Sequence, residues 1–210
     1  TVDGTSGSSQ SLTIDSGSAN VTITGNIGAE PLNNLKINAE DGTGETGTIT
    51  ISGNVGTNSA AGLTGDLDIG NANTPTLNLE GSFYNTTKTQ DYTAVNTGNN
   101  IVISGSAAKF ITANQNIRFK TSGVSLSNNG TTTIDTGSSG AGNVSFAGAI
   151  EANDATSFND LLAITSGSGD VTFTGAIGAT NALGGLTINT SAGDGDITFS
   201  STIGDGSNPG

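Results

Sequence analysis

The chain has 210 residues, of which 33 are glycine, and a formal net charge of −13. The absence of cysteine excludes disulfides, thiolate nucleophiles and Cys-based metal sites. The negative charge disfavours nucleic acids and anionic membranes as partners. No apolar run approaches the roughly 20 residues of a membrane helix, so we expect no membrane insertion of this segment.

Short β-strands are predicted along the chain, because apolar and polar residues alternate in brief runs that bury one face and leave the other wet. A pattern of alternating apolar residues, with a glycine before the last one, occupies residues 21–27, 49–55, 77–83, 144–150, 171–177 and, with Ser201 replacing glycine, 197–203. A shorter Leu-x-Ile pattern precedes most copies, at 12–14, 35–37, 67–69, 162–164 and 186–188. The gaps between the two patterns vary, which indicates that insertions lie in loops while the strands stay stacked.

This repeat is typical of a solenoid, in which a unit buries its apolar face only by stacking on its neighbours. With about 25 residues per coil, we predict an all-β, parallel β-solenoid of about eight coils, formed by residues 1–210 as a single segment of a longer repeat protein. The recurring glycine predicts a bulge or corner where the chain bends around the coil. Two inward columns are expected: Val21, Ile49, Val144, Val171 and Ile197 in one, and Ile23, Ile51, Phe146, Phe173 and Phe199 in the other.

Residues 83–139 depart from the repeat and predict irregular coils with a loop excursion near residues 84–98. This stretch holds both tyrosines and four of the five basic residues. Two interpretations stay open: ordinary drift in a spacer that binds nothing, or a candidate ligand or partner surface. The residues of that candidate surface are Tyr84, Lys88, Tyr92, Lys109, Arg118 and Lys120.

The chain starts and stops within the repeat. IGDGSNPG followed by TVDGTSGSSQSLTID reads like the passage between Ile177 and Ile188, and no signal peptide is found at Thr1. We therefore expect an excised segment with open end coils, which stack on adjoining repeats or on copies of the chain itself. The alternative is that residues 1–10 and 205–210 fold over the ends as caps.

Three passages, LTIDSGSANVTITGNIG, LAITSGSGDVTFTGAIG and LTINTSAGDGDITFSSTIG, resemble the repeats of filamentous-haemagglutinin-like adhesins and related β-solenoid exoproteins. These are large secreted bacterial surface proteins, and TQDYTAVNTGNNI is similar to a recurring element of their repeats. The resemblance implies a right-handed parallel β-helix, secretion, and a structural or adhesive role. It supplies no catalytic residues to carry over.

An enzyme on the same fold is the main alternative. Polysaccharide-degrading enzymes need a carboxylate pair, or a basic group beside a metal. The basic cluster in this chain is Lys109, Arg118 and Lys120, and the carboxylates that could approach it are Asp91 and Asp135. The simpler interpretation is a solvated surface with locally balanced charge.

Weak calcium binding is a further alternative, because Asp170, Asp194 and Asp196 lie in Gly-rich turns and offer hard oxygen ligands. Each departs from the G-G-x-G-x-D-x-U-x repeat that binds Ca²⁺ in solenoids, so we expect no high-affinity site. Turn carboxylates more often bond the local backbone.

The sequence thus predicts a non-catalytic structural or adhesive segment of an extracellular bacterial filament or stalk, at the cell surface or secreted. We expect no cofactor and no catalytic, cofactor-binding or metal-binding residues. The expected partners are copies of the chain or adjoining repeats, end to end, with cell-surface glycans or matrix as further candidates. The alternative is a carbohydrate-binding or polysaccharide-degrading enzyme domain on a parallel β-helix.

Overall fold

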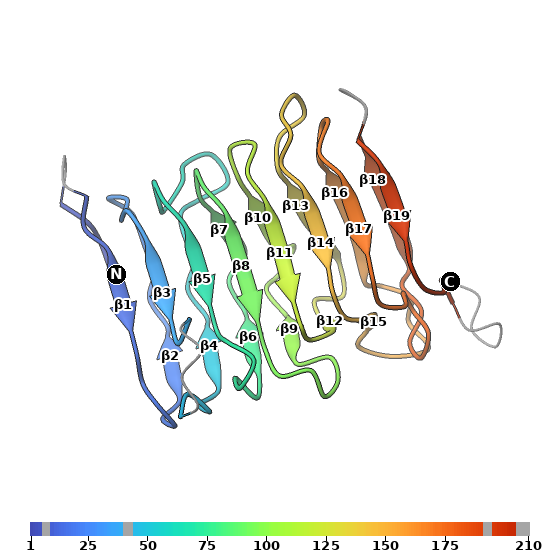
Figure 1. Cartoon of the computed structure of the whole chain (residues 1–210), viewed down its shortest axis with the longest axis horizontal. Helices are drawn as coiled ribbons and strands as arrows, with labels where there is room; N and C mark the ends of the chain where they lie inside the picture. The colour runs from blue at the N-terminus through green and yellow to red at the C-terminus, as the bar shows by residue number, and fades with distance from the viewer. Residues whose placement is uncertain (6–8, 40–43, 191–194, 205–210) are drawn as a thin grey trace.

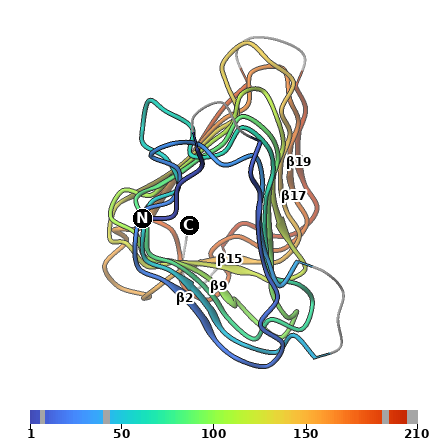
Figure 2. The same cartoon turned by 90° about the vertical axis from the view of Figure 1, so that its left-hand side faces the viewer.

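The computed structural model describes residues 1–5, 9–39, 44–190 and 195–204. They form an all-β solenoid of about seven turns, whose strands run parallel to one another (Figure 1). Viewed along its axis, the solenoid has three sides (Figure 2). In the part of the chain that is described, no helix is long and apolar enough to cross a membrane.

Each side of the solenoid is one parallel sheet. Sheet 1 contains eight strands: β1 (Leu12–Ile14), β3 (Leu35–Ile37), β5 (Leu67–Ile69), β8 (Gln90–Thr93), β11 (Ile117–Lys120), β14 (Val144–Phe146), β17 (Val171–Phe173) and β19 (Ile197–Phe199). Sheet 2 contains six strands: β2 (Val21–Ile23), β4 (Ile49–Ile51), β6 (Leu77–Leu79), β9 (Ile101–Ile103), β12 (Val124–Leu126) and β15 (Ile150–Ala152). Sheet 3 contains five: β7 (Phe83–Asn85), β10 (Lys109–Ile111), β13 (Thr131–Asp135), β16 (Leu161–Thr165) and β18 (Gly185–Asn189).

The core lies inside the three sheets and is built from columns of apolar side chains. Neighbouring strands pair in register, so each turn adds one residue to the same column, as where Val144 pairs with Val171 and Val171 pairs with Ile197. Isolated bridges extend two columns beyond the named strands, through Ile27 on one side and Ile177 on another. Because in-register stacking repeats the same contact at each turn, the core is continuous along the rod.

An aromatic column dominates the later half of sheet 1. Its rings lie nearly parallel, with centroids 5.2, 4.8, 5.4 and 5.0 Å apart in the order Tyr92, Phe119, Phe146, Phe173 and Phe199. A shorter stack on sheet 3 joins it, because Tyr84 and Phe110 stack at 4.8 Å and meet the first column edge to face. Parallel strands in register hold aromatic rings of equivalent positions at the spacing at which offset stacking is favourable.

The predicted corners are confirmed at the repeated glycines. A Cβ on Gly53 would lie 2.1 Å from the carbonyl oxygen of Gly25 in the preceding turn, and one on Gly175 would lie 2.2 Å from the carbonyl carbon of Gly148. No side chain fits between backbones this close, so only glycine allows successive corners to stack.

A column of polar side chains runs along the corner that precedes sheet 1. At most turns its side-chain oxygen accepts a hydrogen bond from the backbone N–H of the equivalent residue one turn later, over 2.8–3.3 Å. The oxygen acceptors of this corner column are Ser11, Asn34, Asp66, Asn116, Asn143 and Asp170, and the column ends at Asp196. These bonds satisfy backbone donors at positions where the sheet ladder has not yet begun.

The two expected inward columns are wrong as written, because the repeat changes its phase relative to the sheets. Val21 and Ile49 pair with each other on sheet 2, whereas Val144, Val171 and Ile197 form a column of sheet 1. In the early copies the longer pattern begins on sheet 2, and in the later copies it begins on sheet 1. The change occurs within residues 83–139, where all three sides are formed by separate strands.

The predicted parallel β-solenoid is confirmed, and the eight strands of sheet 1 mark about seven turns, close to the expected number of coils. One further expectation needs correction. Residues 84–98, expected as an excursion, instead contain most of β7 and all of β8, and both strands pair on each side within their sheets. Alternation alone did not reveal these strands because polar residues, including Gln90 and Asn85, occupy buried positions.

Candidate functional site: a charged groove on sheet 1

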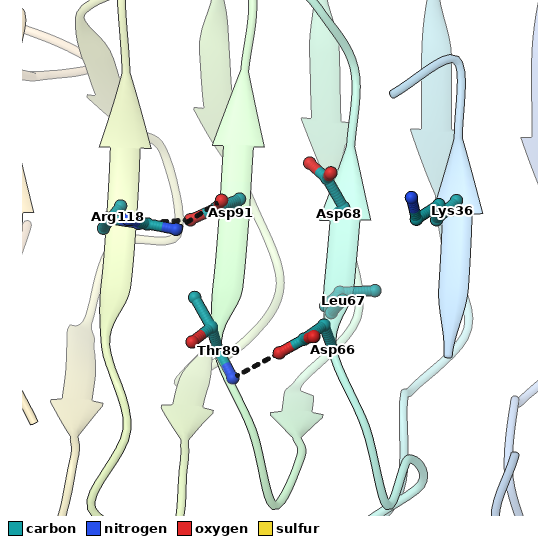
Figure 3. A pocket seen from close by; sticks show the side chains of 7 residues that line it. All are labelled: Lys36, Asp66, Leu67, Asp68, Thr89, Asp91 and Arg118. Atoms are coloured by element: carbon teal, nitrogen blue, oxygen red, sulfur yellow. Dashed lines mark hydrogen bonds and ion pairs between the residues drawn. The ribbon is translucent and has the colours of Figure 1, made fainter. Parts of the chain in front are cut away.

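A row of charged side chains crosses the outer face of sheet 1. Lys36, Asp68, Asp91 and Arg118 occupy equivalent outward positions on β3, β5, β8 and β11, since their strands pair in register (Figure 3). Equivalent residues of adjacent strands lie about 4.8 Å apart along the rod. The fold thus brings together four charges that are far apart in the sequence.

Asp91 is the centre of this row. Its carboxylate accepts a bidentate interaction from Arg118, with Nε at 2.6 Å and Nη2 at 2.7 Å, and the Nζ of Lys120 lies 2.7 Å from Oδ2. Asp91 is 8% exposed, and the hydrogen bond to its carboxylate raises the pKa of Arg118. A carboxylate that is paired with two cations is held in a fixed orientation, which suits a structural or electrostatic role more than proton transfer.

Asp68, on the next strand, has a different environment. Its side chain is half-buried, and no hydrogen bond or ion pair joins it to any of the described residues. Burial and, next, the charge of Asp91 raise the pKa of Asp68, while Lys120, Lys36 and Arg118 oppose that rise. Asp68 is therefore the carboxylate of the row that has unused hydrogen-bonding capacity.

Two adjoining cavities make the groove. One, of about 230 Å³, is lined by Lys36, Asp66, Leu67, Asp68, Thr89, Asp91 and Arg118. The other, of about 290 Å³, shares Asp68 and is lined besides by Ala39, Gly70, Asn71, Ala72, Thr93, Lys120 and Thr121. The lining offers charged groups of both signs and hydroxyl groups, but no aromatic ring. It can therefore form hydrogen bonds to a polar ligand, but it has no ring on which a sugar could stack.

The basic residues predicted as a ligand surface do not form one patch. Arg118 and Lys120 lie on β11 at the groove. Lys109 lies on β10 of sheet 3, where its Nζ donates to Oδ1 of Asn58 at 3.0 Å, and Lys88 lies in the connection between β7 and β8. Asp135 is also on sheet 3, so of the two carboxylates considered only Asp91 meets Arg118.

Tyr84 and Tyr92 are fully buried in the core rather than on a surface. The Tyr84 hydroxyl donates to the carbonyl of Ile51 at 3.3 Å and accepts from the N–H of Gly81 at 3.0 Å; the Tyr92 hydroxyl donates to Oε1 of Gln90 at 3.0 Å. Burial raises the pKa of both phenols above their usual value. They act as core residues whose polar ends are satisfied.

Sequence reasoning missed Lys36, Asp66 and Asp68 as part of this groove. The signal was present, since Lys36 and Asp68 are the middle residues of the Leu-Lys-Ile and Leu-Asp-Ile patterns and must point outward. Alternation within each strand does not show that the early Leu-x-Ile strands and β8 belong to one sheet, so it could not predict that Lys36 and Asp68 lie next to Asp91.

The carboxylates considered for calcium are only partly placed. Asp170 Oδ1 accepts the backbone N–H of Asp196 at 3.0 Å, so this carboxylate bonds the next turn of the solenoid as part of the corner column. Asp194 lies outside the described residues. Within those that are described, no group of three or more His, Cys, Asp or Glu side chains could hold a metal ion. Weak calcium binding stays a prediction.

No protein-family model, no curated protein and no solved structure matches the chain. The parallel solenoid fold therefore stands on the structure, and the resemblance to adhesin repeats stays a prediction from the quoted passages.

Proposed function

We propose that the chain is a structural or adhesive segment of an extracellular bacterial surface filament or stalk, and that it is not catalytic. The observation that carries this proposal is the uniformity of the core along the rod. Each turn adds a strand to sheet 1, isolated bridges continue the other two sides where named strands are lacking, and a single cluster of buried apolar side chains runs through the described turns. Such a core resists bending and stretching, because deforming the rod breaks backbone ladders and side-chain stacks at the same time.

The chemistry of the groove also supports a role without catalysis. Asp91 is held by Arg118 and Lys120, so it is poorly placed to act as a base or a nucleophile. The chain has no cysteine, so its cohesion comes from the stacked core and the backbone ladders and not from disulfides. Expected partners are adjoining repeats or further copies end to end, with surface glycans or matrix as candidates for adhesion.

Surface labelling tests the proposed role directly. Gold-conjugated antibodies raised against the folded chain should label intact source cells on filaments or stalks away from the cell body. Brief protease treatment of intact cells should remove the label. Labelling that appears only after lysis would contradict an extracellular role.

The groove favours a second candidate function, the binding of a carbohydrate. Asp68 has unused acceptors, Lys36 and Arg118 offer donors, and the two cavities adjoin at Asp68 along the direction of the strands, so together they form an extended polar groove across the rod. Titration with neutral and acidic oligosaccharides should then shift the NMR signals of the groove. Lys36→Ala should weaken binding, and Lys109→Ala, which removes the same charge from sheet 3, should not.

The same samples separate binding from degradation. With polysaccharide substrates, the chain should release no new chain ends with or without added divalent metal. Cleavage that requires metal and disappears in Arg118→Ala would establish an enzyme and overturn the non-catalytic proposal.

A further inference from the structure

The charges of the groove on sheet 1 are unevenly paired. Asp91 takes two cations, with Arg118 Nε at 2.6 Å and Lys120 Nζ at 2.7 Å, so these three side chains satisfy one another. Asp66 and Asp68 line the same cavity of about 230 Å³, and neither carboxylate has an ion pair among the described residues. The groove therefore contains two carboxylates whose negative charge no bound cation offsets.

The acceptor groups of this cavity lie on one face of the sheet. Asp66 directly precedes β5 and Asp68 is its middle residue, so their side chains, two positions apart, project from the same face (Figure 3). Asp66 Oδ1 accepts the backbone N–H of Thr89 at 3.0 Å, which leaves the second oxygen of that carboxylate for a ligand. With the hydroxyl of Thr89, which also lines the cavity, a ligand would meet three acceptors.

A protonated primary amine is the group that suits these acceptors. It carries one positive charge and three N–H donors, and hydrogen bonds in which both partners are charged are roughly twice as strong as neutral ones. Burial and the charge of Asp91 raise the pKa of Asp68, and a cation beside that carboxylate would offset both effects. The net charge of −13 favours a cationic ligand further.

The rest of the groove suits the hydroxyl groups of a sugar. The adjoining cavity of about 290 Å³ shares Asp68, and its lining includes Thr93, Thr121 and Gly70, which supply hydroxyl groups and leave room for a ring. Lys36 lies on the other side of Asp68, on β3, where its ammonium can donate to a sugar oxygen. Because the lining has no aromatic ring, hydrogen bonds and charge must orient the sugar.

We propose that the groove binds an amino sugar with a free, protonated amine, whose ammonium donates to the carboxylate of Asp68, with Asp66 and Thr89 as further acceptors. This inference rests on the candidate carbohydrate-binding function and names its ligand class, a glucosamine-type oligosaccharide without N-acetyl groups. An N-acetylated sugar of the same length has no positive charge, and its bulkier amide would leave Asp68 without a counter-ion.

Two tetrasaccharides that differ only at the amine test the proposal, one of glucosamine and one of N-acetylglucosamine. Each is titrated into the folded full chain at about pH 6, where an amine is protonated and an ordinary carboxyl is ionised, and NMR signals of the groove are followed. The glucosamine tetrasaccharide should bind at least about tenfold more tightly. Equal affinities would overturn the inference but leave carbohydrate binding by the groove standing.

A matched pair of variants separates the groove from general attraction to an acidic chain. Asp68→Asn should weaken binding of the glucosamine tetrasaccharide at least about tenfold, whereas Asp135→Asn, which removes the same charge from sheet 3, should not. Asp68→Asn removes a half-buried charge, so the fold should be retained, and circular dichroism checks this. Equal binding by the wild type and Asp68→Asn, or no binding of either tetrasaccharide, would overturn the proposal. Surface labelling of cells tests the rod function independently of these results.

Discussion

Removal of one ring from the middle of the aromatic column should cost far more stability than removal of the ring at its end. Phe146 is 2% exposed and stacks on Phe119 at 4.8 Å and on Phe173 at 5.4 Å. Phe199 is 41% exposed, and among the described residues it stacks on Phe173 alone, at 5.0 Å. Phe146→Ala and Phe199→Ala therefore delete the same atoms from two environments that differ in burial and in the number of stacked partners.

The expected losses follow from those two differences. Burial of a Phe side chain in a core is worth about 3–5 kcal/mol when it is truncated to Ala, and each stacked pair adds about 0.5–1.5 kcal/mol beyond area burial. We expect Phe146→Ala to lower the free energy of unfolding by about 4–5 kcal/mol, near the top of that range. Phe199 has one partner and a partly wet ring, so its truncation should cost about 1–2 kcal/mol.

Urea unfolding measures both losses, and two probes add a test of coupling. Far-UV circular dichroism reports the whole solenoid, while tyrosine fluorescence reports the turns that contain Tyr84 and Tyr92, which precede Phe146 in the chain. In the wild type the two transitions should coincide. In Phe146→Ala they should separate, because weakening one interface of a stacked array uncouples the turns on either side. Equal losses for the two variants, within about 0.5 kcal/mol, would refute the argument from burial and stacking.

Three further predictions follow from single residues. Burial raises the pKa of Tyr84 and Tyr92 above the usual 10.0, so the folded state binds the phenol protons more tightly than the unfolded state does. The free energy of unfolding should therefore keep its full value below pH 10 and decline as the pH rises further, and ultraviolet titration should show phenolate absorbance only as the chain unfolds. A reversible phenolate transition near pH 10 without unfolding would contradict the burial of these tyrosines. Phe173→Asp buries an unpaired charge at a side chain that is 1% exposed and should abolish the β signal in circular dichroism, whereas Thr172→Asp on the outer face should be tolerated; equal tolerance of the two would invalidate the assigned faces. The pKa of Asp68 is raised above 3.8, so ionisation of this carboxyl lowers the free energy of unfolding as the pH rises above about 4. Asp68→Asn should therefore raise the urea midpoint at pH 7 but not at pH 3. An unchanged midpoint at pH 7 would contradict the half-buried environment of Asp68 beside Asp91.

Much of the local structure could be predicted from the residues themselves. Alternation of apolar and polar residues placed strands such as Val171–Phe173 and Ile197–Phe199, and these two strands pair in the register in which the pattern aligns them. The glycine of the longer pattern marked a corner, because Gly175 packs on Gly148 at a distance that excludes any side chain. These features depend on chain stereochemistry and on residues within one repeat, so the sequence determined them without knowledge of the whole fold.

Only the tertiary structure decided which repeats share a sheet. A coil has three sides, and in the stretch around Tyr84 and Tyr92 each side has its own strand. Before this stretch, the longer sequence pattern begins on sheet 2. After it, the same pattern begins on sheet 1. The same arrangement buries both tyrosines and brings Arg118 to Asp91, 27 residues earlier. Loops of variable length separate these residues in the sequence, whereas in the solenoid they are neighbours because parallel strands stack about 4.8 Å apart. The charged groove arises from that stacking, since it combines residues whose spacing in the chain bears no fixed relation to their spacing in the rod.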